Sequence, residues 1–151
     1  MNKNVRWMIL LCSFFNSSLI FSQTDVVDGN RKENKMIAVI FEAFPAGGKW
    51  NEYLDIAAEL RPQLDTMEGF ISVERFQSLA DPKKVLSLSF WENEQSIARW
   101  RNLEQHRYAQ KAGRDFVFDD YRLRIAHVMR DYGMNNRMEA PADSKTIHYE
   151  R

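Results

Sequence analysis

The chain has 151 residues, of which 44% are hydrophobic and 28% are charged, a composition typical of one globular domain. Basic and acidic residues number 21 each, so the formal net charge is zero and no basic surplus points to nucleic-acid binding. Aromatic residues reach 13%, enough to fill a core and also to line a pocket.

The first 23 residues differ in character from the rest of the chain. Lys3 and Arg6 precede the apolar stretch WMILLCSFF, and small and polar residues follow it. This order predicts a secretory signal peptide over residues 1–23, and the apolar run is too short and interrupted for a stable membrane span. We therefore expect an exported protein, periplasmic or secreted. If translation began at Met36 instead, the protein would be cytoplasmic.

Several chemistries lack support in the sequence. Cleavage of the signal peptide would remove Cys12, the single cysteine, and with it any disulfide or thiolate site. The three histidines, at positions 106, 127 and 148, are scattered, so we expect no multi-histidine metal site. The sequence has no P-loop, no dinucleotide glycine fingerprint and no HExxH motif.

Regular elements follow in order after a polar linker over residues 24–35. Hydrophobic periodicity predicts a strand over 36–44, a helix over 49–67, a hairpin of strands 70–78 and 85–92, helical segments 93–103 and 104–112, and a strand over 120–132. Asn93 is a candidate N-cap, and Gly113 is expected to stop the last helical segment. This β-α-β-β-α-β order predicts an α+β, ferredoxin-like fold with an antiparallel sheet over residues 36–133, followed by a polar tail over 134–151.

Both faces of the first strand are apolar. One face carries Ile37, Val39, Phe41 and Ala43, and the other carries Ala38, Ile40 and Phe44. Because two helices cover only one face, we predict a homodimer packed sheet to sheet. Glu42 interrupts the apolar pattern and is expected to pair with an arginine of the last strand. The arginines of this strand are Arg122, Arg124 and Arg130. They indicate either a salt-bridged strand face or an anion-binding site.

Three segments together resemble the antibiotic biosynthesis monooxygenase (ABM) family. They are MIAVIFEAFPAG, the run from LRPQLD to QKAGR that contains GFISVERF and SLSFWENEQSIARW, and DYRLRIAHVMRDYG. The resemblance covers about residues 36–133 and implies a dimeric α/β barrel. The family includes quinol and anthrone oxygenases, heme-degrading enzymes and members without known activity, so the resemblance leaves the reaction open.

The resemblance to the family's oxygenases implies chemistry without a metal or organic cofactor. A small aromatic or quinol-type substrate would lose a proton, and the anion would reduce O₂ directly, given an apolar slot, a base and anion-stabilising donors. His106 is the candidate base because its ordinary pKa lies near neutrality. Arg101, with Arg107 as an alternative, would stabilise negative charge. The candidate substrate-binding residues are Trp100, Trp91, Phe90 and Tyr108.

Each candidate also has a structural explanation. Trp100 lies at helical spacing on a buried face and would serve equally as core, while Trp91 would instead face a partner subunit. His106 is also explained as a surface or capping residue, and His127 as a satisfied core or interface histidine. The alternative function is a non-enzymatic dimeric module that holds a hydrophobic small molecule in the same slot.

Heme degradation is disfavoured on the resemblance itself. That branch uses an Asn near the end of the first strand, a Trp in the second helical region, and a His about three turns further on as the iron ligand. Trp100 matches the Trp, but the Asn position falls near Glu42 or Ala43. The ligand position falls near Gln110, which cannot replace an axial histidine.

Overall fold

A computed structural model describes residues 36–147, so the predicted signal peptide, the linker and the last four residues lie outside the described part. The elements are β1 (Ile37–Pro45), α1 (Trp50–Asp65), β2 (Phe70–Gln77), β3 (Val85–Trp91), α2 (Glu94–Asn102), α3 (Glu104–Ala112), a π-helical turn (Gly113–Val117), β4 (Phe118–His127) and α4 (Ala142–Ile147). The strands form one antiparallel sheet in the order β2-β3-β1-β4. The predicted α+β, ferredoxin-like fold is confirmed.

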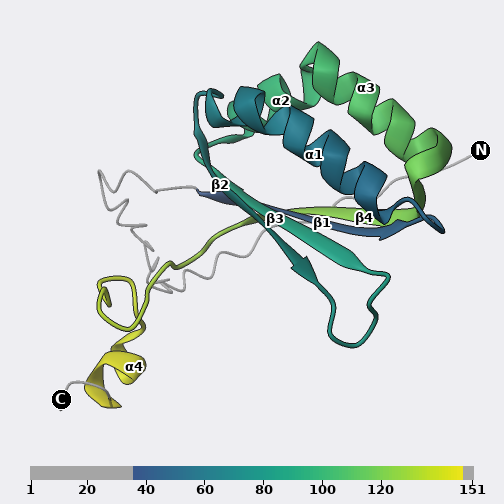
Figure 1. Cartoon of the computed structure of the whole chain (residues 1–151). Helices are drawn as coiled ribbons and strands as arrows, with labels where there is room; N and C mark the ends of the chain where they lie inside the picture. The colour runs from purple at the N-terminus through teal and green to yellow at the C-terminus, as the bar shows by residue number, and fades with distance from the viewer. Residues whose placement is uncertain (1–35, 148–151) are drawn as a thin grey trace, which may run out of the picture. The chain divides into compact units, whose positions relative to one another are not determined.

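Helices α1, α2 and α3 all lie over the same face of the sheet (Figure 1). The helix-facing residues build two core clusters, one at each end of the sheet. One contains Ile37, Leu64, Trp91 and Ile97. The other contains Ala43, Tyr53, Val85 and Val117. None of the helices within residues 36–147 is long and apolar enough to cross a membrane.

The start of α2 is held by two local features. Asn93 caps the helix, as predicted, because its Oδ1 accepts hydrogen bonds from Ser96 N at 2.9 Å and Ser96 Oγ at 3.0 Å. Gly69 lies directly against this turn with a φ of +78°, and a Cβ there would stand 2.1 Å from Ser96 Oγ. The close approach seats the beginning of α2 on the beginning of β2, and α2 carries Trp100.

One predicted boundary is corrected, and another is confirmed with a different local geometry. β4 ends at His127 rather than at residue 132. His127 pairs with Ile37, the first residue of β1, so β1 has no further strand residue with which β4 could pair. Helix α3 ends at Ala112 with Gly113 as its C-cap, as predicted, but Gly113 keeps a helical φ of −53° and opens the π-helical turn. A glycine is needed there for space, since a Cβ would lie 2.9 Å from the ring of Phe118.

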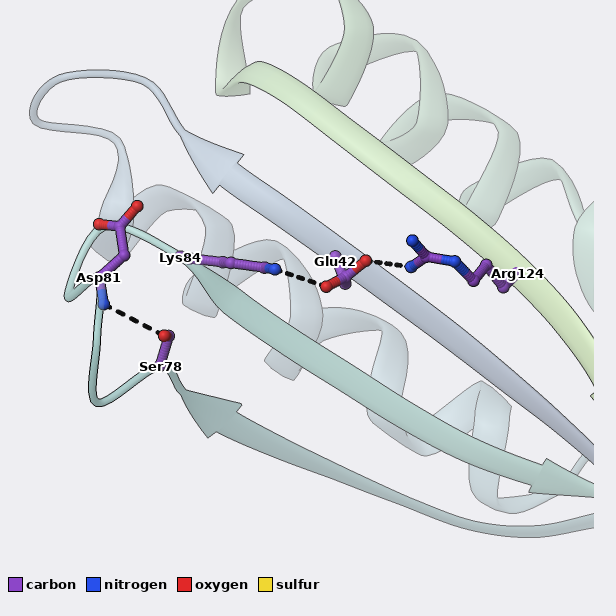
Figure 2. Close-up of polar contacts among 5 residues, drawn as sticks. All are labelled: Glu42, Ser78, Asp81, Lys84 and Arg124. Atoms are coloured by element: carbon purple, nitrogen blue, oxygen red, sulfur yellow. Dashed lines mark hydrogen bonds and ion pairs between the residues drawn. The ribbon is translucent and has the colours of Figure 1, made fainter.

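The sheet face turned away from the helices carries a charged cluster. Glu42 on β1 accepts hydrogen bonds from Lys84 Nζ, at 2.5 Å, and from Arg124 Nη1 on β4 (Figure 2). The expected pairing of Glu42 with an arginine of the last strand is therefore confirmed. The bonds from Lys84 and Arg124 lower the pKa of Glu42 from 4.5 to about 2. In the nearby β2–β3 loop, Asp81 N donates to Ser78 Oγ at 3.1 Å.

The described part of the polar tail has order of its own. It includes the short helix α4, and Arg137 Nη2 donates to Ser144 Oγ at 2.6 Å. Lys145 Nζ donates to the Met138 carbonyl at 2.7 Å.

Candidate functional site: a cavity between the sheet and the helices

A cavity of about 310 Å³ lies between the sheet and the helix layer. Its floor consists of two complete rows of residues that cross all four strands. One row is Arg75, Ser87, Phe41 and Leu123. The next is Val73, Ser89, Val39 and Ile125. Both β3 positions are serines, whose short side chains leave space below the helices.

The helices supply the walls and roof. Helix α1 contributes an apolar wall through Ile56, Ala57, Leu60 and Leu64, and its first turn contributes Tyr53. The roof comes from Trp100 and Arg101 on α2, and from His106, Ala109 and Gln110 on α3. The cavity is therefore mainly apolar with a few polar groups, the usual character of a small-molecule site.

His106 has a defined orientation and tautomer. Its ring stacks on Trp100, with centroids 4.3 Å apart and 22° between planes. Its Nδ1 lies 2.9 Å from the Trp100 carbonyl oxygen, which can only accept, so Nδ1 carries the hydrogen. Nε2 then holds the free lone pair. The amide of Gln110, 3.2 Å from Nδ1, instead donates to the Arg101 carbonyl at 3.0 Å.

The environment of His106 favours the neutral ring. Burial lowers the pKa of His106, and the hydrogen bond to the Trp100 carbonyl opposes that shift only in part. The imidazole is therefore unprotonated at neutral pH, which is the state a general base requires.

Trp91 faces the helix layer, which corrects the idea that it faces a partner subunit. Its side chain is 1% exposed, it lines the cavity, and its Nε1 donates to Ser89 Oγ at 2.9 Å. Trp91 thus closes one end of the cavity and orients one of the two floor serines.

Several polar side chains lie close together where β2 meets α1. Arg75 Nε donates to the Tyr53 hydroxyl at 3.1 Å, and the guanidinium lies 5.9 Å from the tyrosine ring centroid. Tyr53 is only 6% exposed, and burial raises the pKa of its hydroxyl against the opposing influence of Arg75. Ser87 is the cross-strand neighbour of Arg75.

The cavity opens along β4. Leu123 and Ile125 line it and yet are 51% and 45% exposed, because the helices do not close over this edge strand. Arg101 and Arg114 also line it and reach solvent. Arg101 has a loose ion pair with Glu94, at 3.8 Å.

Not every predicted site residue reaches the cavity. The structure brings together His106, Arg101, Trp100 and Trp91. Phe90 does not join them, because it pairs with Ala38 on the opposite face of the sheet. Tyr108 is 67% exposed and lines a separate depression between α1 and α3. His127 is exposed at the end of β4, so it is not the core histidine that its apolar neighbours suggested.

Sequence reasoning missed the polar residues of the floor and of the α1 end. Ser87 and Ser89 had a signal, since they alternate with Trp91 on one face of β3. Tyr53 and Arg75 had none, because they lie on different elements, 22 residues apart. Within residues 36–147, no group of three or more His, Cys, Asp or Glu side chains is arranged to hold a metal ion.

The sequence profile of the antibiotic biosynthesis monooxygenase family matches residues 36–112, which covers β1 to α3 and most of the cavity. The chain belongs to this family, as the resemblance predicted.

Two curated relatives are similar over parts of their length. A jasmonate monooxygenase of Pyricularia oryzae is 48% identical over 93 residues, which cover 62% of this chain and 43% of that protein. The uncharacterized protein YqjZ of Bacillus subtilis is 32% identical over 62 residues, which cover 41% of this chain and 53% of that protein. The chain therefore spans only about half the length of these relatives.

Solved structures share the fold at low sequence identity. A variant of SnoaB, a cofactor-independent oxygenase from Streptomyces nogalater, superposes with a TM-score of 0.57 at 9% identity, over 64% of this chain and 96% of that one. A conserved protein from Methanosarcina mazei gives a TM-score of 0.57 at 17% identity, over 62% of this chain and 92% of that one.

Proposed function

We propose that the protein is a cofactor-independent monooxygenase that oxidises a small aromatic or quinol-type substrate in the cavity. The observation that carries the proposal is His106, a neutral, tautomer-defined imidazole at the roof of an apolar cavity. Membership of a monooxygenase family supports it, as does the likeness in fold to a cofactor-independent oxygenase.

The proposed reaction balances without an added reductant. His106 Nε2 takes a proton from an acidic C–H or O–H group, and the resulting anion donates electrons to O₂. One oxygen atom enters the substrate, and the other leaves as water with two hydrogens from the substrate, so a CH₂ group becomes a carbonyl. Trp100 fixes the base by stacking, and Arg101 stabilises the negative charge.

Oxygen uptake against a panel of quinols and anthrones tests this proposal, and jasmonate joins the panel because of the Pyricularia relative. His106→Ala should lower kcat/KM by about 10²-fold or more, whereas the control His127→Ala, an exposed histidine outside the cavity, should leave it unchanged. As the pH is lowered, activity should fall only below about pH 6.5, the ordinary pKa of histidine, because burial lowers the pKa of His106.

Full turnover by His106→Ala would refute the role of base. No turnover on any substrate would instead favour the non-enzymatic binding module that uses the same cavity.

We also propose that the protein is a homodimer through the sheet face opposite the helices. Apolar side chains on that face support the proposal: Phe76 is 45% exposed, and Ile40, Phe44, Leu88 and Phe90 are half-buried. Light scattering should give twice the monomer mass, and Leu88→Glu should give the monomer mass. A wild-type monomer at micromolar concentration would refute this proposal.

A further inference from the structure

The cavity has a polar end that the proposed oxidation does not use. Arg75, Tyr53 and Ser87 all line it, although they come from β2, α1 and β3. The hydrogen bond from Arg75 Nε to the Tyr53 hydroxyl joins the first two. Ser87 is the direct antiparallel partner of Arg75, so their Cα atoms lie about 5 Å apart.

Arg75 and Tyr53 both have donor capacity to spare. Arg75 uses Nε on Tyr53, and its two terminal nitrogens have no acidic partner among the ion pairs of the described residues. The Tyr53 oxygen accepts from Arg75, and its own hydrogen has no acceptor within the part of the chain that the structure describes. Burial raises the pKa of Tyr53, so the hydroxyl keeps that hydrogen. A buried donor without an acceptor is uncommon in folded proteins.

A guanidinium and two hydroxyls at one end of an apolar cavity match the oxygens of a carboxylate. Arginine binds carboxylates through two parallel N–H groups, and the adjacent hydroxyls would complete the set of donors. Arg101 and Arg114 offer less, because Arg101 is already near Glu94 and no hydrogen bond within residues 36–147 ties the Arg114 side chain to another polar side chain.

We propose that Arg75, Tyr53 and Ser87 bind an acidic group of the ligand, so that the cavity takes an apolar molecule carrying one carboxylate. This inference shares the cavity with the proposed function but does not depend on its catalytic residues. His106 and Trp100 belong to the roof of the cavity and not to this polar end. It narrows the substrate class to apolar acids.

A pair of fluorescent probes separates charge from apolar contact. 8-Anilinonaphthalene-1-sulfonate carries an acidic group on the same ring skeleton as the neutral N-phenyl-1-naphthylamine, and the sulfonate stands in for the carboxylate. Wild-type protein should bind the anionic probe more tightly. Arg75→Gln should weaken that probe about tenfold and Tyr53→Phe about threefold, while the neutral probe changes less than about twofold.

The control is Arg122→Gln, which removes the same charge from the opposite face of the sheet, where Arg122 pairs with Glu42 in register. Its affinity for both probes should equal that of wild type. Tyr53→Phe removes only a hydroxyl, so it keeps the test valid if Arg75→Gln fails to fold.

Four results would overturn the inference. Two concern Arg75→Gln: an equal loss of affinity for both probes, or an unchanged affinity for the anionic probe. The third is a weaker affinity of Arg122→Gln for the anionic probe, and the fourth is that wild type binds neither probe. Because binding is measured without turnover, wild-type protein that shows oxygen uptake but no preference for the anionic probe would reject the acid subsite alone. A clear preference of wild type for the anionic probe without oxygen uptake would reject the oxidation alone.

Discussion

Replacing Gly69 by alanine tests how closely α2 is seated on the sheet. The substitution has two separate costs. The first is conformational: φ is +78°, a region in which an L side chain costs about 1 kcal/mol after the gain from a stiffer unfolded chain. The second is steric, because the new Cβ would lie 2.1 Å from Ser96 Oγ and 2.9 Å from Ser96 Cβ.

The steric cost cannot be relieved by rotating a loose side chain. Ser96 is fully buried, and its hydroxyl both donates to Asn93 Oδ1 at 3.0 Å and accepts from Arg99 Nη2 at 3.0 Å. Either the hydrogen bonds break or the helix shifts, and overpacking of this kind costs about 1–3 kcal/mol. We therefore expect Gly69→Ala to lower the free energy of unfolding by about 2–4 kcal/mol in total.

Urea unfolding measures the loss, and Gly48→Ala is the matched control. Gly48 has a φ of +79°, yet a Cβ there would meet nothing within 4 Å, so this variant should lose only the conformational part, about 1 kcal/mol. Equal losses in the two variants would refute the close contact with Ser96. The double variant Gly69→Ala/Ser96→Gly should lose less than the sum of its single changes, because the clashing atoms are gone.

Three further predictions concern the cap, the charged cluster and the exposed tyrosine. Asn93→Ala should lower the free energy of unfolding by about 1 kcal/mol in urea melts, because α2 loses its N-cap; an unchanged midpoint would contradict the cap. The pKa of Glu42 falls from 4.5 to about 2 on folding, so its stabilising contribution is complete above pH 4.5 and is lost as pH falls toward 2. Urea midpoints across this range should therefore decline less steeply in Glu42→Gln than in wild type, and identical slopes would contradict the pairing. Tyr108→Ser should change the unfolding free energy by less than about 0.5 kcal/mol and leave probe binding intact, since the side chain is 67% exposed; a large loss would return Tyr108 to the site.

Local patterns predicted the elements of this fold well, because the strands alternate strictly and the helices have clear apolar spacing. The same patterns left open which face of the sheet the helices would cover, since both faces of β1 are apolar. That choice decides between Trp91 and Phe90, which are adjacent and must point to opposite faces. Once the helices cover the Trp91 face, Phe90 has to face away from the cavity.

The misplacement of Tyr108 has a similar cause. Residues two positions apart on an α-helix point about 200° apart around its axis. His106, Ala109, Gln110 and Gly113 face the cavity at helical spacing, so Tyr108 cannot. His106 and Tyr108 were therefore incompatible as joint pocket residues, and helix geometry alone could have excluded the pair.

Strand β3 separates two roles by a single residue step. Ser87, Ser89 and Trp91 face the cavity, while Leu86, Leu88 and Phe90 face the proposed dimer interface. A slip of one residue would move leucines into the space that the serines leave and would fill the cavity. The charged cluster around Glu42 opposes such a slip, because it ties β1 to Lys84 just before β3 and to Arg124 on β4 (Figure 2). Charges on one face of the sheet thus help to keep the cavity open on the other.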